Sequence, residues 1–227
     1  MEVDLRADDV RSRFSQRSPL GSVYLGGGTP SLMSAAQVEQ LLATIEQQLG
    51  LAPEAEITLE ANPGSDEVGD LTGFRAAGVN RLSLGAQSLD DGELRRLGRR
   101  HRAVDVAAAM AAARAAGIES VSLDLLTDVP GQTVDSWRAT LRAALALEPD
   151  HLSVYTLTLD DPEAEGLTGP DGDHLPVSSG ARAWRSRATA EQSEERAVRM
   201  ELLTDELAAA AGIERYEIAN LARPGHE

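Results

Sequence analysis

The stretch Tyr24-Leu25-Gly26-Gly27-Gly28-Thr29-Pro30 ends an apolar run in three glycines, a threonine and a proline. Similar short runs of β-favouring residues recur down the chain, and each ends in small or polar residues. They predict buried strands over residues 22–25, 56–61, 81–87, 120–126 and 151–157. Helical stretches rich in Ala, Leu, Arg, Glu and Gln separate these runs. This alternation predicts an α/β fold with a parallel sheet, in which a ligand lies beyond the carboxyl ends of the strands.

The segments between the strands carry helix signals. Ser34 is a suitable N-cap for a helix that reaches Leu49, and Gly50 is its expected stop. Further helices are expected over residues 2–17, 66–77, 91–97, 103–116, 134–147 and 188–211, with a last strand over 215–220. Residues 160–180 are rich in Asp, Gly, Pro and Ser, which predicts a surface insertion or, alternatively, a lid over the site.

Length, charge and the distribution of apolar residues exclude several classes of protein. The chain has 227 residues, 42% of them hydrophobic, which suits one domain with a buried core. Its formal net charge of −16 argues against binding to nucleic acid or an anionic membrane. No apolar run approaches the roughly 20 residues of a membrane helix, and the acidic N-terminus is unlike a secretory signal. We therefore expect a soluble cytoplasmic protein without membrane insertion.

A set of ordered motifs carries a resemblance to a known family. The motifs are Gly26-Gly27-Gly28-Thr29-Pro30, Glu60-Ala61-Asn62-Pro63, Gly78-Val79-Asn80-Arg81-Leu82-Ser83-Leu84-Gly85-Ala86-Gln87-Ser88, Leu97-Gly98-Arg99, Ser122-Leu123-Asp124-Leu125 and Pro130-Gly131-Gln132-Thr133. Together they resemble the radical S-adenosylmethionine (SAM) enzymes related to oxygen-independent coproporphyrinogen III oxidase. The second motif and the stretch from Tyr216 to Gly225 are more similar to the HemW-type heme-chaperone branch. The resemblance covers about residues 15–160 and resumes at about 195–225.

The resemblance implies a partial (β/α)6 TIM-like barrel with SAM across the carboxyl ends of its strands. It implies that Gly27, Gly28 and Thr29 hold the methionyl end of SAM through backbone groups, and that Glu60 accepts hydrogen bonds from the same ligand. The further polar contacts that it implies are Gln87, Arg99, Asp124 and Thr158. In the complete family a [4Fe–4S] cluster and heme are also bound, and heme or porphyrin and heme-accepting proteins are the implied partners.

Each of these residues also has an ordinary structural interpretation. Glu60 can be a strand-end charge, Gln87 a loop-ordering amide, and Arg99 part of a solvated helix face. Asp124 lies in an apolar run, where a buried carboxylate needs a partner, so a structural pairing with an arginine is the alternative. Asn62-Pro63 and Pro130-Gly131 are interpreted as turn elements. The histidines show no ligand spacing and are expected on the surface or in loops: His101, His151, His174 and His226.

The sequence departs from the family pattern in two respects. The chain contains no cysteine, whereas the family holds its cluster with a Cys-x-x-x-Cys-x-x-Cys loop after the first strand. At the fifth strand the family commonly has Asp-Leu-Ile-Tyr-Gly-Leu-Pro, and here Thr127-Asp128 replace the Tyr-Gly pair. We expect this replacement to alter the turn and to add a negative charge near the site.

The sequence is therefore interpreted as a single incomplete radical SAM core domain over residues 1–227, missing its first strand. Within it, about 160–190 form a variable insertion and 191–227 begin the connection to an absent C-terminal domain. The predicted function is that of a HemW-type heme chaperone, inactive in radical chemistry without the cluster cysteines. The alternatives are an oxygen-independent coproporphyrinogen III oxidase, a cluster-free SAM- or tetrapyrrole-binding module, and a degenerate fragment.

Overall fold

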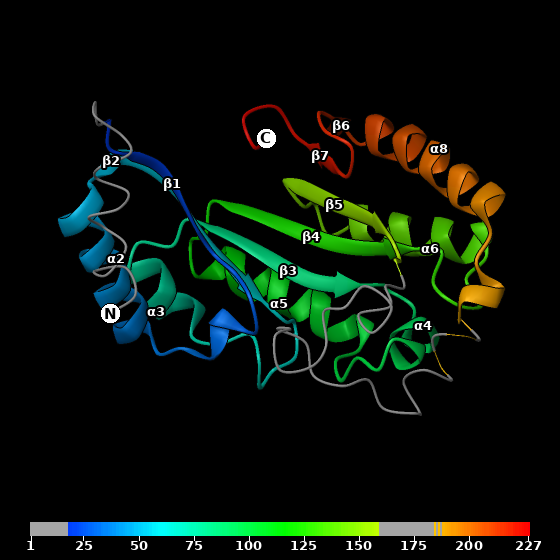
Figure 1. The fold of residues 1–227 in the computed structure, drawn as a ribbon, viewed down its shortest axis with the longest axis horizontal. Helices are drawn as coiled ribbons and strands as arrows, with labels where there is room; N and C mark the ends of the chain where they lie inside the picture. The colour runs from blue at the N-terminus through cyan, green and yellow to red at the C-terminus, as the bar shows by residue number, and fades with distance from the viewer. Residues whose placement is uncertain (1–17, 159–183, 185, 187) are drawn as a thin grey trace, which may run out of the picture.

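The structure, a computed structural model, describes residues 18–158, 184, 186 and 188–227. These residues form a curled seven-stranded sheet in the order β1-β2-β3-β4-β5-β7-β6 (Figure 1). Strands β1 to β5 are parallel, whereas β7 is antiparallel to both β5 and β6. The strands are β1 (Leu20–Leu25), β2 (Leu51–Ala61), β3 (Arg81–Gln87), β4 (Ser120–Thr127), β5 (His151–Thr156), β6 (Glu214–Arg215) and β7 (Asn220–Ala222). The predicted α/β fold, a partial TIM-like barrel with a parallel sheet, is confirmed.

Helices connect the parallel strands and cover one face of the sheet (Figure 1). The long helix α8 follows β5 in the chain and packs against α6 through Trp137, whose indole Nε1 donates to the Met200 carbonyl at 3.1 Å. No helix within the described ranges is both long and apolar enough to cross a bilayer. The helices are η1 (Pro30–Leu32), α2 (Ala35–Leu49), α3 (Leu71–Ala76), α4 (Asp91–Arg96), α5 (Ala103–Ala115), α6 (Val134–Leu145) and α8 (Glu194–Ala210).

Two predicted helices begin later than expected. Instead of starting at residue 66, α3 starts at Leu71, because Gly69 takes a left-handed φ of +76° and the Asp70 side chain then caps the helix. The helix expected over residues 188–211 is interrupted, and α8 begins at Glu194 because the Ser193 side chain accepts the backbone N–H of Arg196. The helix expected over 2–17 and the insertion over 160–180 lie outside the described residues.

The prediction of one last strand over residues 215–220 is wrong. The chain reverses there into a short hairpin, in which the backbone N–H of Tyr216 donates to the Asn220 carbonyl at 3.2 Å. β7 then pairs antiparallel with β5, with His151 opposite Ala222. A reversal of only a few residues can produce an antiparallel pair, whereas a parallel strand needs a long crossover.

The two faces of the sheet differ in chemistry. Residues that point toward the helices are apolar and fully buried, and they include Leu59, Leu82, Leu84, Leu123 and Leu125. The residues between them in each strand point to the inner face, and nearly all are polar: Thr58, Glu60, Arg81, Ser83, Ser122, Asp124, His151 and Ser153. Barrels of this type are usually filled with branched apolar side chains. A polar inner wall instead leaves room for water or a polar ligand.

Candidate functional site

The glycine-rich segment forms a turn at the carboxyl end of β1. Gly27 has φ of +89° and Gly28 has φ of +65°, and both values lie in the left-handed region that favours glycine. Thr29 follows at the N-cap of η1 without capping the helix through its side chain. The chain therefore crosses the strand ends with backbone groups, rather than side chains, nearest to the neighbouring strands.

A polar cavity of about 430 Å³ lies at the carboxyl ends of the strands. Most of the predicted site residues line it, although they come from separate loops and strands: Gly28, Thr29, Glu60, Gln87, Arg99 and Asp124. Gly27 adjoins it through a hydrogen bond from its backbone N–H to Glu60 Oε2 at 3.0 Å. Thr158 is exposed and its hydroxyl donates to the Thr156 carbonyl, so the structure does not bring it to this cavity. Ligand binding by these residues stays a prediction.

Glu60 is held at both carboxylate oxygens. The Tyr24 hydroxyl donates to Oε1 at 2.8 Å, while the Gly27 N–H occupies Oε2. Burial, together with the hydrogen bond and charge of Glu60, raises the pKa of Tyr24 above its usual value. Gly26 permits this contact, because a Cβ there would lie 2.7 Å from the Tyr24 ring and 3.0 Å from the Glu60 carboxyl. Glu60 therefore fixes the glycine turn against β2 in addition to lining the cavity.

Gly26→Ala is expected to break the hydrogen bonds that Tyr24 and Gly27 donate to Glu60. The added methyl must displace Tyr24 or Glu60, so the Gly27 amide loses its acceptor and exchanges with solvent about two- to tenfold faster. Native-state hydrogen exchange read at Gly27 measures the change. Gly21→Ala in β1, the strand that leads to Gly26, is the matched control, since a Cβ at Gly21 meets no atom within 4 Å. Equal Gly27 exchange in the two variants would contradict the assignment.

Gln87 and Arg99 line the cavity together with Asn62. Gln87 has a left-handed φ of +65°, which is uncommon for a residue with a side chain, and a Cβ at Gly85 would lie 3.0 Å from its amide Nε2. Arg99 is half-buried, and its Nη1 lies 3.5 Å from Asn62 Oδ1. Burial lowers the pKa of Arg99. The solvated-face interpretation therefore fits Arg100, which pairs with Asp66 outside, but not Arg99.

Asp124 lies in the inner wall of the cavity on β4. Both of its carboxylate oxygens are 3.0 Å from the Ser83 hydroxyl, which donates to them from β3. Burial raises the pKa of Asp124 to about 6, with a hydrogen bond from Ser83 acting in the opposite direction. No arginine forms an ion pair with Asp124 within the described ranges. The structural pairing considered from the sequence is thus not observed, and the carboxylate faces the cavity.

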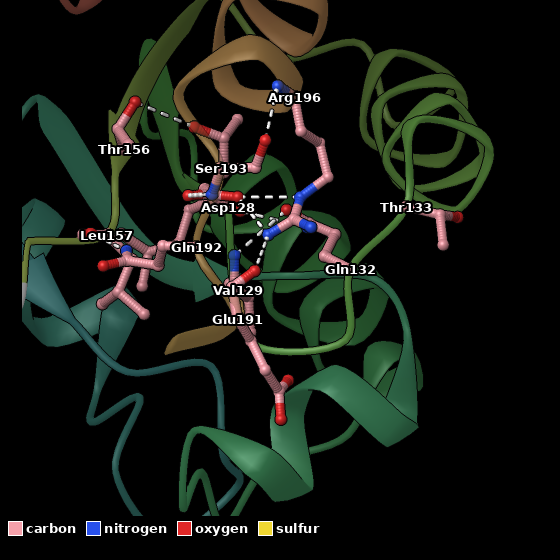
Figure 2. Close-up of polar contacts among 12 residues, drawn as sticks. Asp128, Val129, Gln132, Thr133, Thr156, Leu157, Glu191, Gln192, Ser193 and Arg196 are labelled. Carbon is pink, nitrogen blue, oxygen red and sulfur yellow. Dashed lines mark hydrogen bonds and ion pairs between the residues drawn. The ribbon is translucent and has the colours of Figure 1, made fainter. Parts of the chain in front are cut away.

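The charge of Asp128 does not enter the cavity, which corrects the expectation from the sequence. Asp128 keeps the turn that glycine would form, with φ of +56°. Its Oδ1 accepts Arg196 Nε at 2.8 Å and Nη2 at 2.5 Å, and its Oδ2 accepts the Ser193 N–H at 3.1 Å. Figure 2 shows these contacts at the start of α8. The extra carboxylate therefore joins the end of β4 to α8.

One of the histidine predictions is wrong, because His151 is buried on the inner face of β5. His101 lies in the loop between α4 and α5, as expected, but it is buried there, and its Nε2 lies 3.1 Å from the Ala86 carbonyl. The absence of ligand spacing says nothing about burial, since a single hydrogen-bonded imidazole can pack anywhere in a fold. His226 is half-buried beside Ser120, and His174 lies outside the described residues.

Sequence reasoning missed three contributors to this cavity or its walls. Tyr24 clamps Glu60, Ser83 contacts Asp124, and Asn62, interpreted as a turn residue, lines the cavity. The signal was present in the strict alternation of polar and apolar residues, as in Leu82-Ser83-Leu84 and Val121-Ser122-Leu123. A period of two assigns polar residues to a separate face of each strand.

Comparisons with known proteins agree with this geometry. The family model described as the radical SAM superfamily matches residues 2–144. Two similar curated proteins are heme chaperones HemW, from Synechocystis (37% identical, 99% of this chain, 51% of that protein) and Haemophilus influenzae (43%, 69% and 41%). The chain thus spans about half the length of these relatives. The solved structure of the radical SAM enzyme coproporphyrinogen III oxidase (HemN) from Escherichia coli matches all of this chain and 50% of its own, with a TM-score of 0.74 and 26% identity. The chain belongs to the radical SAM superfamily.

Proposed function

We propose that this chain is the SAM-binding core of a HemW-type heme chaperone. One observation carries the proposal: residues from four separate strand ends and from the turn after α4 meet in one polar cavity. The identity to HemW proteins from two bacteria supports the chaperone branch. The lower identity to coproporphyrinogen III oxidase makes an oxidase activity the second candidate.

The residues of the cavity suit the charges of SAM. The carboxylates of Glu60 and Asp124 would face its ammonium and sulfonium groups, and Arg99 would bind its carboxylate. The left-handed turn at Gly27 and Gly28 brings backbone donors and acceptors close to the same space. These side chains would hold and orient SAM.

The residues present do not fit the cluster itself. The 227 residues include no cysteine, and the described ranges hold no group of three or more side chains that could bind a metal ion. These 227 residues are accordingly expected not to cleave SAM. Heme or porphyrin and heme-accepting proteins would be the partners of the whole protein, with a cytoplasmic location and without nucleic acid. Similarity to the heme chaperones supports heme as the ligand of the whole protein.

Calorimetry with SAM tests the assigned cavity. Gly28→Val is expected to abolish binding, because the left-handed backbone at φ +65° is strained by a branched side chain that would also occupy the cavity. Gly117→Val is the matched control: Gly117 has φ of +79° and open space around a Cβ, but it does not line the cavity. Equal heats in both variants and wild type would show that the site is elsewhere. A saturable hemin titration, followed by absorbance, tests the heme part separately.

A further inference from the structure

A second cavity, of about 330 Å³, lies on the inner face nearer the amino ends of the strands. It shares Ser83 with the cavity at the strand ends but is otherwise built mainly from different residues. Hydroxyl groups dominate its wall, together with one guanidinium and one imidazole. Its lining is Tyr24, Thr58, Arg81, Ser83, Ser122, His151, Ser153, Tyr155, Tyr216 and Asn220.

Among the described residues that line this wall, Arg81 is the one arginine or lysine. It is the first residue of β3 and is 8% exposed. Its Nη1 donates to Glu56 Oε2 at 2.9 Å and to the His226 carbonyl at 3.2 Å. Its Nε and Nη2 donate to no group within the described ranges, and no buried side-chain nitrogen there lacks a partner. These two donors therefore reach the open space of the cavity.

The field of Arg81 persists in the cavity despite its ion pair with Glu56. Burial and, second to it, the charge of Arg81 lower the pKa of His151 to about 4, and Arg81 lowers this pKa by more than Glu56 raises it. The Glu56 side chain is 44% exposed, so water screens its charge more than that of Arg81. The potential at the imidazole thus stays positive.

His151 organises another part of the polar wall. Its Nδ1 lies 2.8 Å from the Ser122 hydroxyl and its Nε2 lies 2.9 Å from the Tyr216 hydroxyl. A neutral imidazole donates from one of these nitrogens and accepts at the other. One of the two hydroxyls therefore donates its hydrogen to the ring, while the other accepts the ring N–H and can donate its own hydrogen elsewhere. The wall therefore offers an O–H donor in addition to the two free N–H groups of Arg81.

We propose that this lower cavity is a second ligand site, which takes a carboxylate group. Two adjacent N–H donors of one guanidinium match the two oxygens of a carboxylate, and whichever of the Ser122 and Tyr216 hydroxyls does not donate to His151 can donate to a remaining lone pair. The carboxylates of Glu60 and Asp124 line the upper cavity and not the lower one, and they accept hydrogen bonds from Tyr24 and Ser83 in its wall. The site needs neither SAM nor heme and stands independently of the proposed function.

Propionate is the probe that tests this site, and propionamide is its neutral isostere. NMR signals of the Arg81 Nε–H and of the His151 ring in the 227-residue chain are followed at constant ionic strength. Propionate is expected to shift both signals saturably, and propionamide is expected to leave them unchanged. Equal responses to the two compounds, or a propionate response that does not saturate, would overturn the proposal. This comparison of propionate with propionamide tests the proposal in the wild-type protein, without any variant.

Two arginine variants locate the response. Arg81→Gln is expected to abolish the propionate shift at His151, whereas Arg75→Gln is expected to leave it intact. Arg75 is the matched control because it pairs with Glu119 on the outer surface and lies outside the cavity. Retention of the shift in Arg81→Gln would place the anion elsewhere. Gly28→Val, which tests the upper cavity, is expected to leave propionate binding unchanged, so the two sites fail independently.

Discussion

Arg196→Met is expected to lower the free energy of unfolding by about 3–5 kcal/mol, because it leaves the buried carboxylate of Asp128 without its cation. The Asp128 side chain is 4% exposed, and its remaining hydrogen bond would be the one from the Ser193 N–H. Figure 2 shows Arg196 reaching from α8 to this carboxylate. Urea unfolding measures the loss.

Asp128→Gly is expected to cost less than Arg196→Met. Glycine accepts the φ of +56° without strain, and the Arg196 side chain, at 24% exposure, can turn toward water. The double variant is expected to be more stable than Arg196→Met alone, since it removes the uncompensated charge.

A second ion pair provides the control for burial. Arg215→Met leaves the Asp205 carboxylate without its ion-pair partner. The Arg215 side chain is 23% exposed, nearly the same fraction as that of Arg196, but the Asp205 side chain is 46% exposed. The expected cost of losing this ion pair is about 1 kcal/mol or less, because the freed carboxylate stays hydrated. Similar losses in Arg196→Met and Arg215→Met would contradict the role of burial.

The free energy of unfolding of the wild type is expected to include a contribution from Asp124 that decreases as the pH rises from about 4 to 6. Asp124→Asn is expected to lack this decrease. The pKa of Asp124 is raised to about 6 from 3.8, so the folded state binds the proton more tightly than the unfolded chain. Ionisation through this window therefore destabilises the folded state, by about 3 kcal/mol at 1.36 kcal/mol per pKa unit. Above pH 7 the stability of Asp124→Asn relative to wild type is expected to be higher than at pH 4 by about this amount.

His151 acts in the opposite direction, so only the difference between the two proteins is informative. Its pKa is lowered from 6.5 to about 4, so its contribution to the free energy of unfolding increases as the pH rises from about 4 to 6.5. This contribution is common to wild type and Asp124→Asn and cancels in the comparison. Unfolding free energies are measured for both at pH 4, 5.5 and 7.5. A constant difference across this range would show that Asp124 titrates normally, and a uniform loss in Asp124→Asn would indicate a structural partner.

Much of the fold could be predicted from local pattern. The five parallel strands were expected because apolar runs ending at Gly26 or Gln87 alternate with helical segments. The cap at Ser34 and the stop at Gly50 were read from the chemistry of single residues. The error at Arg215 to Asn220 arose because a two-residue and a three-residue strand have no periodicity of their own. Their pairing is decided by the edge of β5.

The site was predicted in composition but not in its internal contacts. Parallel strands place their carboxyl ends at one edge, so the sequence alone brought Gly28, Glu60 and Asp124 together. It could not show that Tyr24 holds Glu60 across 36 positions, since that contact depends on the register of β1 against β2.

Residue patterns were enough to predict the five parallel strands and the helices between them, the polar strand ends and the lack of thiolates, because these follow from local periodicity and residue chemistry. The directions of charges and the burial of single groups emerged only from the folded chain. Asp128 adds a negative charge in the sequence, yet the fold directs it to Arg196, 68 positions away. His151 and Arg81 become the wall of a second cavity for the same reason: burial and ion pairing depend on distances through space that no local pattern contains.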